Sequence, residues 1–420
     1  RHRTGSGSGH GAGQRPRIGH RGMNFFSFHL MPWPHLAGPR EFLAANEAAW
    51  VTLSNSNYDP AQGKELYDRY IAELVAAEEL GLDGVVVNEH HQNAYGLMPS
   101  PNLMAAALTR ETSRVKICVL GNALPLYNPP TRVAEEMAML DVMSGGRLIA
   151  GLVVGGGPEY YSTNVNPTEA RPRFREAVDL VIQAWTRPGP FAFDGEYYQL
   201  PYVNPWPRPL QQPHPPVWIP GLGSPSTITY CVEHGFGYMG VAYYAPPETF
   251  VRQARSYRDA VDVSGRAFDP ELLGWLTTVY VSETDEQAVE EAAPHLAYFQ
   301  GTLAAGFVGP GKVWMPPGYI DPPALVQFLS DLRGMVQGPR PSDARAAVWR
   351  RSPLVGSPET VRERLLSFVN ELGLGTILAL LQFGSLPSDL TARSTHLYAT
   401  EVVPYVREHA EKHFAAQGWV

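Results

Sequence analysis

Cysteine is scarce in this sequence, since Cys118 and Cys231 are the only two among 420 residues. Two cysteines cannot form a disulfide framework and are too few for a cysteine-based zinc site, and such sparing use is typical of a reducing cytosol. Long apolar runs are also missing: stretches such as 375–383 fall well short of the roughly 18 residues that a membrane span requires. No charged-then-apolar signal opens the chain. We therefore expect a soluble, cytoplasmic protein.

Positive charge is in short supply as well. The chain has 33 Lys and Arg against 41 Asp and Glu, which gives a net charge of −8. Its first 22 residues hold five arginines and no acid, so the remainder carries 28 − 41 = −13. An acidic body of this kind disfavours nucleic acid and anionic membranes as partners. Because residues 1–22 lack hydrophobic periodicity, we predict a disordered N-terminal extension there and a single domain over residues 23–420.

What the sequence does have is a regular alternation of short apolar runs with amphipathic helical stretches. The predicted strands lie at 24–31, 84–88, 115–122, 147–154, 217–220, 236–241, 272–281 and 375–383. The predicted helices lie at 63–80, 102–111, 130–143, 173–185, 225–233, 247–261, 284–297, 358–372 and 389–409. Parallel strands need helical crossovers and closure removes the sheet edges, so this pattern favours an α/β fold, a (β/α)₈ TIM barrel. A doubly wound open sheet is the alternative.

Two insertions interrupt the alternation, one after the fourth strand and one after the seventh. Residues 191–200, with Asp194-Gly195 at their centre, predict a hairpin. Residues 300–350 carry clusters of glycine and proline around one possible helix at 323–335, which predicts a long surface excursion. This excursion sits at the mouth of the expected site, and we predict that it forms a lid that orders when flavin is bound. Its apolar cover over the site would come from Phe307, Trp314, Met315 and Tyr319. A permanently packed excursion is the alternative.

In such a barrel the active site lies at the carboxyl ends of the strands. The second strand ends in Asn88-Glu89-His90-His91, and a histidine there can act as a general base or a hydrogen-bond donor near neutral pH. A structural or solvent-facing pair is the alternative interpretation. We expect no metal site, because the sequence has neither His-Glu-x-x-His nor Cys-x-x-Cys.

Further landmarks follow these histidines in a characteristic order, and together they resemble the bacterial luciferase-like flavin-dependent monooxygenase family. The resemblance extends from about Asn24 to Glu408, and it is weakest over 32–60 and in the excursion. The landmarks are Pro99-Ser100-Pro101-Asn102, Ala123-Leu124-Pro125-Leu126-Tyr127-Asn128-Pro129, Leu140-Asp141-x-x-Ser144-x-Gly146-Arg147, Val355-Gly356-Ser357-Pro358-Glu359, Glu371-x-Gly373 and Val402-Val403-Pro404.

The resemblance implies a two-component monooxygenase. In this family reduced FMN, delivered by a separate NAD(P)H-dependent flavin reductase, reacts with O₂ to give a flavin hydroperoxide that oxygenates a small organic substrate. His90 matches the catalytic histidine, and His91 is its neighbour in the pocket. Leu120, Gly121 and Asn122 match the position of a non-proline cis peptide that supports the flavin ring; a plain strand-end bulge is the alternative.

A phosphate site is predicted where the fifth strand runs into a helix. The glycine-rich turn 221–227 offers backbone N–H groups at a helix N-terminus, which bind anions, although an ordinary capped helix has the same pattern. Gly223, Ser224, Ser226 and Thr227 are the expected contacts, and Ser224 and Thr227 match phosphate contacts of the family. Val154 stands where luciferase has an arginine, so Arg173 is the candidate for the balancing charge, with Arg171 close behind.

The sequence gives weaker signals for the substrate pocket and for the oligomeric state. Aromatic residues that follow strands suit a probably apolar substrate, although ordinary packing is the alternative for each of them. Glu89 could orient an imidazole, and Glu159 has no assigned role. We expect a homodimer. Alternative functions are a deazaflavin (F420)-dependent oxidoreductase of the same fold and a non-catalytic flavin-binding protein. The aromatic candidates are Phe28, Trp33, Tyr160, Tyr161, Tyr243 and Tyr244.

Overall fold

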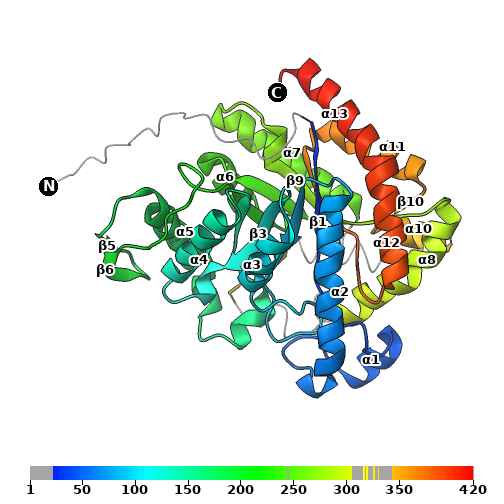
Figure 1. The fold of residues 1–420 in the computed structure, drawn as a ribbon, viewed down its shortest axis with the longest axis horizontal. Coiled ribbons are helices and arrows are strands. Elements are labelled where there is room, and N and C mark those ends of the chain that lie inside the picture. The colour runs from blue at the N-terminus through cyan, green and yellow to red at the C-terminus, as the bar shows by residue number, and fades with distance from the viewer. Residues whose placement is uncertain are drawn as a thin grey trace.

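The computed structural model describes residues 22–243, 246–304 and 343–419, together with residues 316, 318, 319, 325, 326 and 330. Within this part of the chain, eight parallel strands close into a barrel with helices around it, as predicted (Figure 1). In spatial order the strands are β1 (Asn24–Phe28), β2 (Gly84–Val87), β3 (Lys116–Ala123), β4 (Leu148–Val153), β7 (Val217–Gly221), β8 (Gly237–Val241), β9 (Leu273–Val281) and β11 (Thr376–Leu380).

The barrel strands are buried on both faces, which is why they appear in the sequence as continuous apolar runs. Every residue of β2 and every residue of β9 is buried. Pairing of β8 with β9, with Tyr238 opposite Leu273, closes the sheet on itself. The open-sheet alternative is therefore excluded.

The helices lie outside the barrel and follow the predicted ranges closely. The first long one, α2, begins where Asp59 accepts hydrogen bonds from the N–H groups of Ala61 and Gln62, and Pro60 occupies its first turn. The main helices are α2 (Pro60–Glu79), α3 (Pro101–Glu111), α4 (Thr131–Met143), α5 (Ala170–Thr186), α6 (Pro225–His234), α7 (Pro247–Ser264), α8 (Asp285–Tyr298), α11 (Pro358–Leu372), α12 (Ser388–Leu397) and α13 (Val403–Gln417).

The closing helix differs from the single helix predicted at 389–409. The structure divides it into α12 and α13 with a wider turn, Tyr398–Val402, between them. Pro404 lies in the first turn of α13. Proline has no N–H with which to continue the hydrogen bonding of a preceding helix, which accounts for the break.

The sequence prediction also missed three short elements, and it placed the hairpin correctly. The missed elements are α1 (Pro39–Ala45), α10 (Ala344–Trp349) and β10 (Leu354–Gly356), which pairs with β9 outside the barrel. The predicted hairpin is present as β5 (Phe191–Asp194) and β6 (Gln199–Val203).

Several predictions fall where little or nothing is described. The expected extension over 1–22 lies outside the described residues except for its last residue. So does most of the excursion at 300–350, including Phe307, Trp314, Met315 and nearly all of the helix at 323–335. Cys118 and Cys231 are both buried and free. Among the helices of the described part, none is long and apolar enough to cross a bilayer.

Candidate functional site

The histidine pair lies at the carboxyl end of β2, in a loop that is held on both sides. Asn88 donates through Nδ2 to the carbonyl of His29 at 2.8 Å, which ties the end of β2 to the end of β1. The N–H of His90 donates to the carbonyl of Met98 at 3.1 Å and so closes the loop. The two imidazoles are partly exposed, at 20% and 29% of their side-chain surface. They are therefore fixed in place and still accessible to a ligand.

Glu89 serves His91. Its Oε1 lies 2.9 Å from Nε2 of His91, and this hydrogen bond raises the pKa of the imidazole. Its Oε2 accepts from the hydroxyl of Tyr127 at 2.8 Å and from Nδ2 of Asn122 at 3.0 Å. The buried carboxylate thus links the end of β2 to the end of β3.

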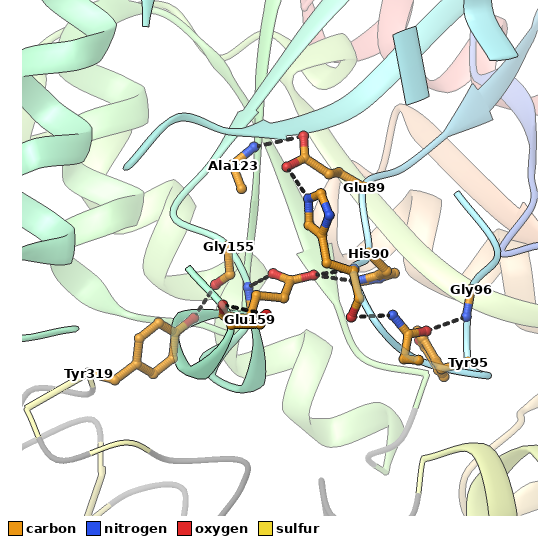
Figure 2. A network of polar contacts seen from close by, with 12 residues as sticks. Glu89, His90, Tyr95, Gly96, Ala123, Gly155, Glu159 and Tyr319 are labelled. Atoms are coloured by element: carbon orange, nitrogen blue, oxygen red, sulfur yellow. Dashed lines mark hydrogen bonds and ion pairs between the residues drawn. The ribbon is translucent and has the colours of Figure 1, made fainter. Parts of the chain in front are cut away.

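The carboxylate of Glu159 contacts the imidazole of His90 (Figure 2). It lies in a short turn, Gly157–Tyr161, that follows β4, and it is completely buried. Its Oε1 lies 3.2 Å from Nδ1 of His90 and accepts from the N–H of His91 at 3.3 Å. Its Oε2 accepts from the N–H of Gly156 at 2.5 Å. Sequence reasoning gave this residue no role, and the only signal for one was an acid in a glycine-rich segment after a strand.

An aromatic cluster packs around His90. The rings of Trp50 and Tyr95 meet the imidazole edge-on, with centroids 5.3 and 5.2 Å away. Tyr95 shares a 2.6 Å hydrogen bond between hydroxyls with Tyr243, which follows β8, and Phe299 packs against both tyrosines at 5.8 and 5.9 Å. Since β2 and β8 are four strands apart in an eight-stranded ring, this contact spans the barrel mouth.

The predicted aromatic residues are not all brought to this cluster. Of those that the structure describes, only Tyr243 belongs to it, while Trp50, Tyr95 and Phe299 were missed. Tyr160 packs against Tyr319, whose hydroxyl donates to the carbonyl of Gly155. Phe28 and Trp33 are buried, Tyr161 is 52% exposed, and Tyr244 lies outside the described residues.

The peptide bond between Leu120 and Gly121 is cis, as the family resemblance implies. It sits at an irregularity in the pairing of β3 with β4. A Cβ at Gly121 would lie 2.4 Å from the carbonyl carbon of Gly151, so only glycine fits here. Beside it, Oδ1 of Asn88 and Oδ1 of Asn122 are buried and have no hydrogen-bond partner among the described residues.

The predicted phosphate turn has the expected local geometry. Gly223 has a φ of +97°, which favours glycine, and Ser224 stands at the N-cap of α6. The hydroxyls of Ser224 and Ser226 lie 3.0 Å apart, and the N–H of Thr227 donates to the carbonyl of Ser224. Gln253 of α7 contributes a donor that the sequence did not indicate: its Nε2 is buried, is without a partner in the described part of the chain, and lies beside Gly223.

Arg173, the first candidate for the balancing charge, has other partners. Arg173 pairs with Glu169 at 2.9 Å and lies 4.9 Å from the ring centroid of Tyr197 in the hairpin. Burial raises the pKa of Tyr319, and the charge of Arg171 opposes that rise. The histidines and residues 120–122 lie together, because Glu89 contacts both His91 and Asn122. Arg173, in contrast, is held by Glu169 and the hairpin.

One cavity lies well away from these groups. It has a volume of about 400 Å³ at the amino ends of β8 and β9 and is lined by Val232, Tyr257, Phe268 and Trp419 among others. In the described residues no cluster of His, Cys, Asp and Glu could hold a metal ion.

The chain belongs to the luciferase-like monooxygenase family, whose model matches residues 47–375. It is 27% identical to the oxygenase component of a flavin-dependent trigonelline monooxygenase from Acinetobacter baylyi, over 59% of this chain and 68% of that protein. It is 33% identical to an F420-dependent glucose-6-phosphate dehydrogenase from Kineococcus radiotolerans, over 46% of this chain and 58% of that protein. The fold is similar to that of the oxygenating constituent of 3,6-diketocamphane monooxygenase from Pseudomonas putida, with a TM-score of 0.66 and 20% identity over 91% of this chain and 98% of that one.

Proposed function

We propose that this protein is a flavin-dependent monooxygenase that uses reduced FMN and O₂ to oxygenate a small, apolar organic substrate. The observation that carries the proposal is His90, held by a buried carboxylate at the mouth of a barrel that belongs to the luciferase-like monooxygenase family. The trigonelline relative, named as an oxygenase component, supports a reductase as a separate partner protein.

The residues at the barrel mouth fit a reduced flavin. Asn88 and Asn122 each present a buried amide oxygen that lacks a donor among the described residues, and a reduced flavin ring carries N–H groups. The backbone at Leu120 and Gly121 would lie against that ring. Gly223, Ser224, Ser226 and Thr227, with Gln253 beside them, would receive the phosphate through hydroxyl and N–H donors. Reduced FMN, when bound, supplies the electrons that activate O₂.

The protein's own groups would supply proton transfer and an apolar enclosure. His90 can exchange a proton or donate a hydrogen bond at the ring nitrogen that Glu159 leaves unused. His91, whose pKa is raised by Glu89, can carry a positive charge beside the flavin. Trp50, Tyr95 and Phe299 exclude water and favour an apolar ligand.

A homodimer and a cytoplasmic location are also part of the proposal. Leu103 of α3 is 69% exposed, and Met139 and Val142 of the adjacent α4 are 49% and 47% exposed. Exposed apolar side chains on two adjacent helices support an interface with a second copy of the chain on this side of the barrel. The scarcity of cysteine supports the cytoplasm.

Deazaflavin-dependent hydride transfer is the second candidate, and the relative from Kineococcus favours it. Titration calorimetry with reduced FMN and with the deazaflavin cofactor separates the two. We expect micromolar binding of reduced FMN and O₂ consumption when it is offered with apolar carbonyl compounds, with one atom of labelled O₂ in the product. Tight deazaflavin binding without FMN binding would overturn the proposal.

A further inference from the structure

Glu159 has the surroundings of a residue that acts through another one. It is completely buried, and its two oxygens receive the N–H groups of His91 and Gly156. Its remaining contact is with Nδ1 of His90. It therefore joins the loop after β2 to the loop after β4 at the point where the candidate catalytic imidazole stands.

We infer that Glu159 is the positioning residue of His90, and that it holds the imidazole with a proton on Nδ1 and leaves Nε2 for the reaction. This inference rests on the proposed function. A carboxylate has only acceptors to offer, so the 3.2 Å contact requires a proton on Nδ1. Nε2 of His90 makes no hydrogen bond to the described residues and is the nitrogen that can exchange a proton.

The neighbouring imidazole is held in the opposite way, so one carboxylate cannot replace the other. Glu89 contacts Nε2 of His91, not Nδ1, and its second oxygen is occupied by Tyr127, Asn122 and Ala123. The Trp50 and Tyr95 rings fix the plane of the His90 ring but offer its nitrogens no carboxylate. Loss of Glu159 therefore frees the choice of tautomer at His90 alone.

The direct test is ¹⁵N NMR of the protein labelled at histidine, without flavin, with the His90 signals assigned by comparison with His90→Ala. In the wild type we expect the neutral ring to carry its proton on Nδ1. In Glu159→Ala the proton should move toward Nε2, whereas Glu159→Gln, which keeps an amide oxygen as acceptor, should retain much of the original tautomer. An unchanged Nδ1–H tautomer in Glu159→Ala would overturn the inference.

Kinetics give the second readout. We expect Glu159→Ala to lower kcat for oxygenation by roughly 10-fold to 100-fold with little change in KM, and Glu159→Gln to recover part of the loss. Glu78→Ala is the control, because Glu78 also accepts backbone N–H groups, from Arg114 and Val115, but at the far end of the barrel. Its kcat should equal that of the wild type, and a loss in it as large as in Glu159→Ala would reduce Glu159 to a structural role.

The two measurements also separate this inference from the proposed function. A tautomer change on loss of Glu159 in a protein that never consumes O₂ would refute the monooxygenase and keep the positioning role. An active oxygenase whose Glu159→Ala variant keeps both the tautomer of His90 and kcat would support the monooxygenase and refute the positioning role.

Discussion

Two adjacent histidines are held by two carboxylates through different ring nitrogens, and this difference separates their roles. Nδ1 of His90 faces Glu159, while Nε2 of His91 faces Glu89. Among the described residues, no partner binds Nε2 of His90, and proton transfer requires such a free ring nitrogen. His91 forms the shorter contact, and the pKa of its ring is raised. This difference supports the proposed roles, in which His90 transfers a proton and His91 carries a positive charge.

Replacement of His90 tests the first role. We expect His90→Ala to keep the fold and FMN binding and to lose roughly 10²–10⁴-fold in oxygenation, because that is the usual contribution of a positioned acid–base group. Consumed O₂ should then be released as hydrogen peroxide. Product formation and peroxide release are measured together, with His91→Ala as the comparison, which should lose less. Equal rates in both variants and the wild type would make His90 a structural residue.

The raised pKa of His91 predicts a pH-dependent contribution to stability. A group whose pKa is higher in the folded state stabilises the fold fully below its unfolded pKa of about 6.5, and this contribution disappears as the pH rises through the folded value. We expect His91→Ala to reduce the free energy of unfolding more at pH 5.5 than at pH 9. Urea denaturation at both values measures it, and a constant difference would contradict the prediction.

At this scale the sequence predicted where the histidines lie, at the carboxyl end of the second strand, and the structure has them there, after β2. The catalytic role expected of His90 came from the family resemblance and stays a prediction. Glu159 is 69 residues away from His90, and Tyr243 is 148 residues away from Tyr95. Such pairs form only when the barrel brings separate strand ends together. No local pattern could therefore have revealed them.

At the scale of elements, prediction succeeded where burial makes a strong pattern and failed where an element is short. All eight barrel strands were placed, since strands covered on both faces are apolar throughout. The three-residue β10 and six-residue α10 are too short to show a period. The break between α12 and α13 was marked by Pro404, which the prediction did not use.

Contact between β3 and β4 predicts a strict need for glycine. A methyl group at Gly121 would lie 2.4 Å from the carbonyl carbon of Gly151, which is backbone and cannot move aside cheaply. We expect Gly121→Ala to cost about 1–3 kcal/mol or more in the free energy of unfolding, as overpacking does. Gly38→Ala is the control, since no atom lies within 4 Å of its added Cβ and its φ is −63°. Denaturant titration compares them, and equal stabilities would refute this close approach.

At the scale of the whole molecule, exposed apolar groups mark where another surface would fit. Leu103, Met139 and Val142 lie on the neighbouring helices α3 and α4 (Figure 1), on the outside of the barrel. Val263 is 90% exposed as well, but it lies at the end of α7. Single exposed apolar residues are normal, whereas a group on two packed helices is the pattern of an interface.

A charge placed on the α3–α4 surface should therefore separate the proposed dimer. We expect Leu103→Glu combined with Met139→Glu to give a monomer in sedimentation velocity, because each carboxylate would have to be buried in the interface without a partner. Val263→Glu, which changes an isolated exposed residue, should leave the mass unchanged. Flavin binding measured alongside shows whether the barrel itself is intact. If the double variant binds flavin and keeps the wild-type mass, the copies meet elsewhere or the protein is a monomer, and the apolar groups on α3 and α4 have another purpose.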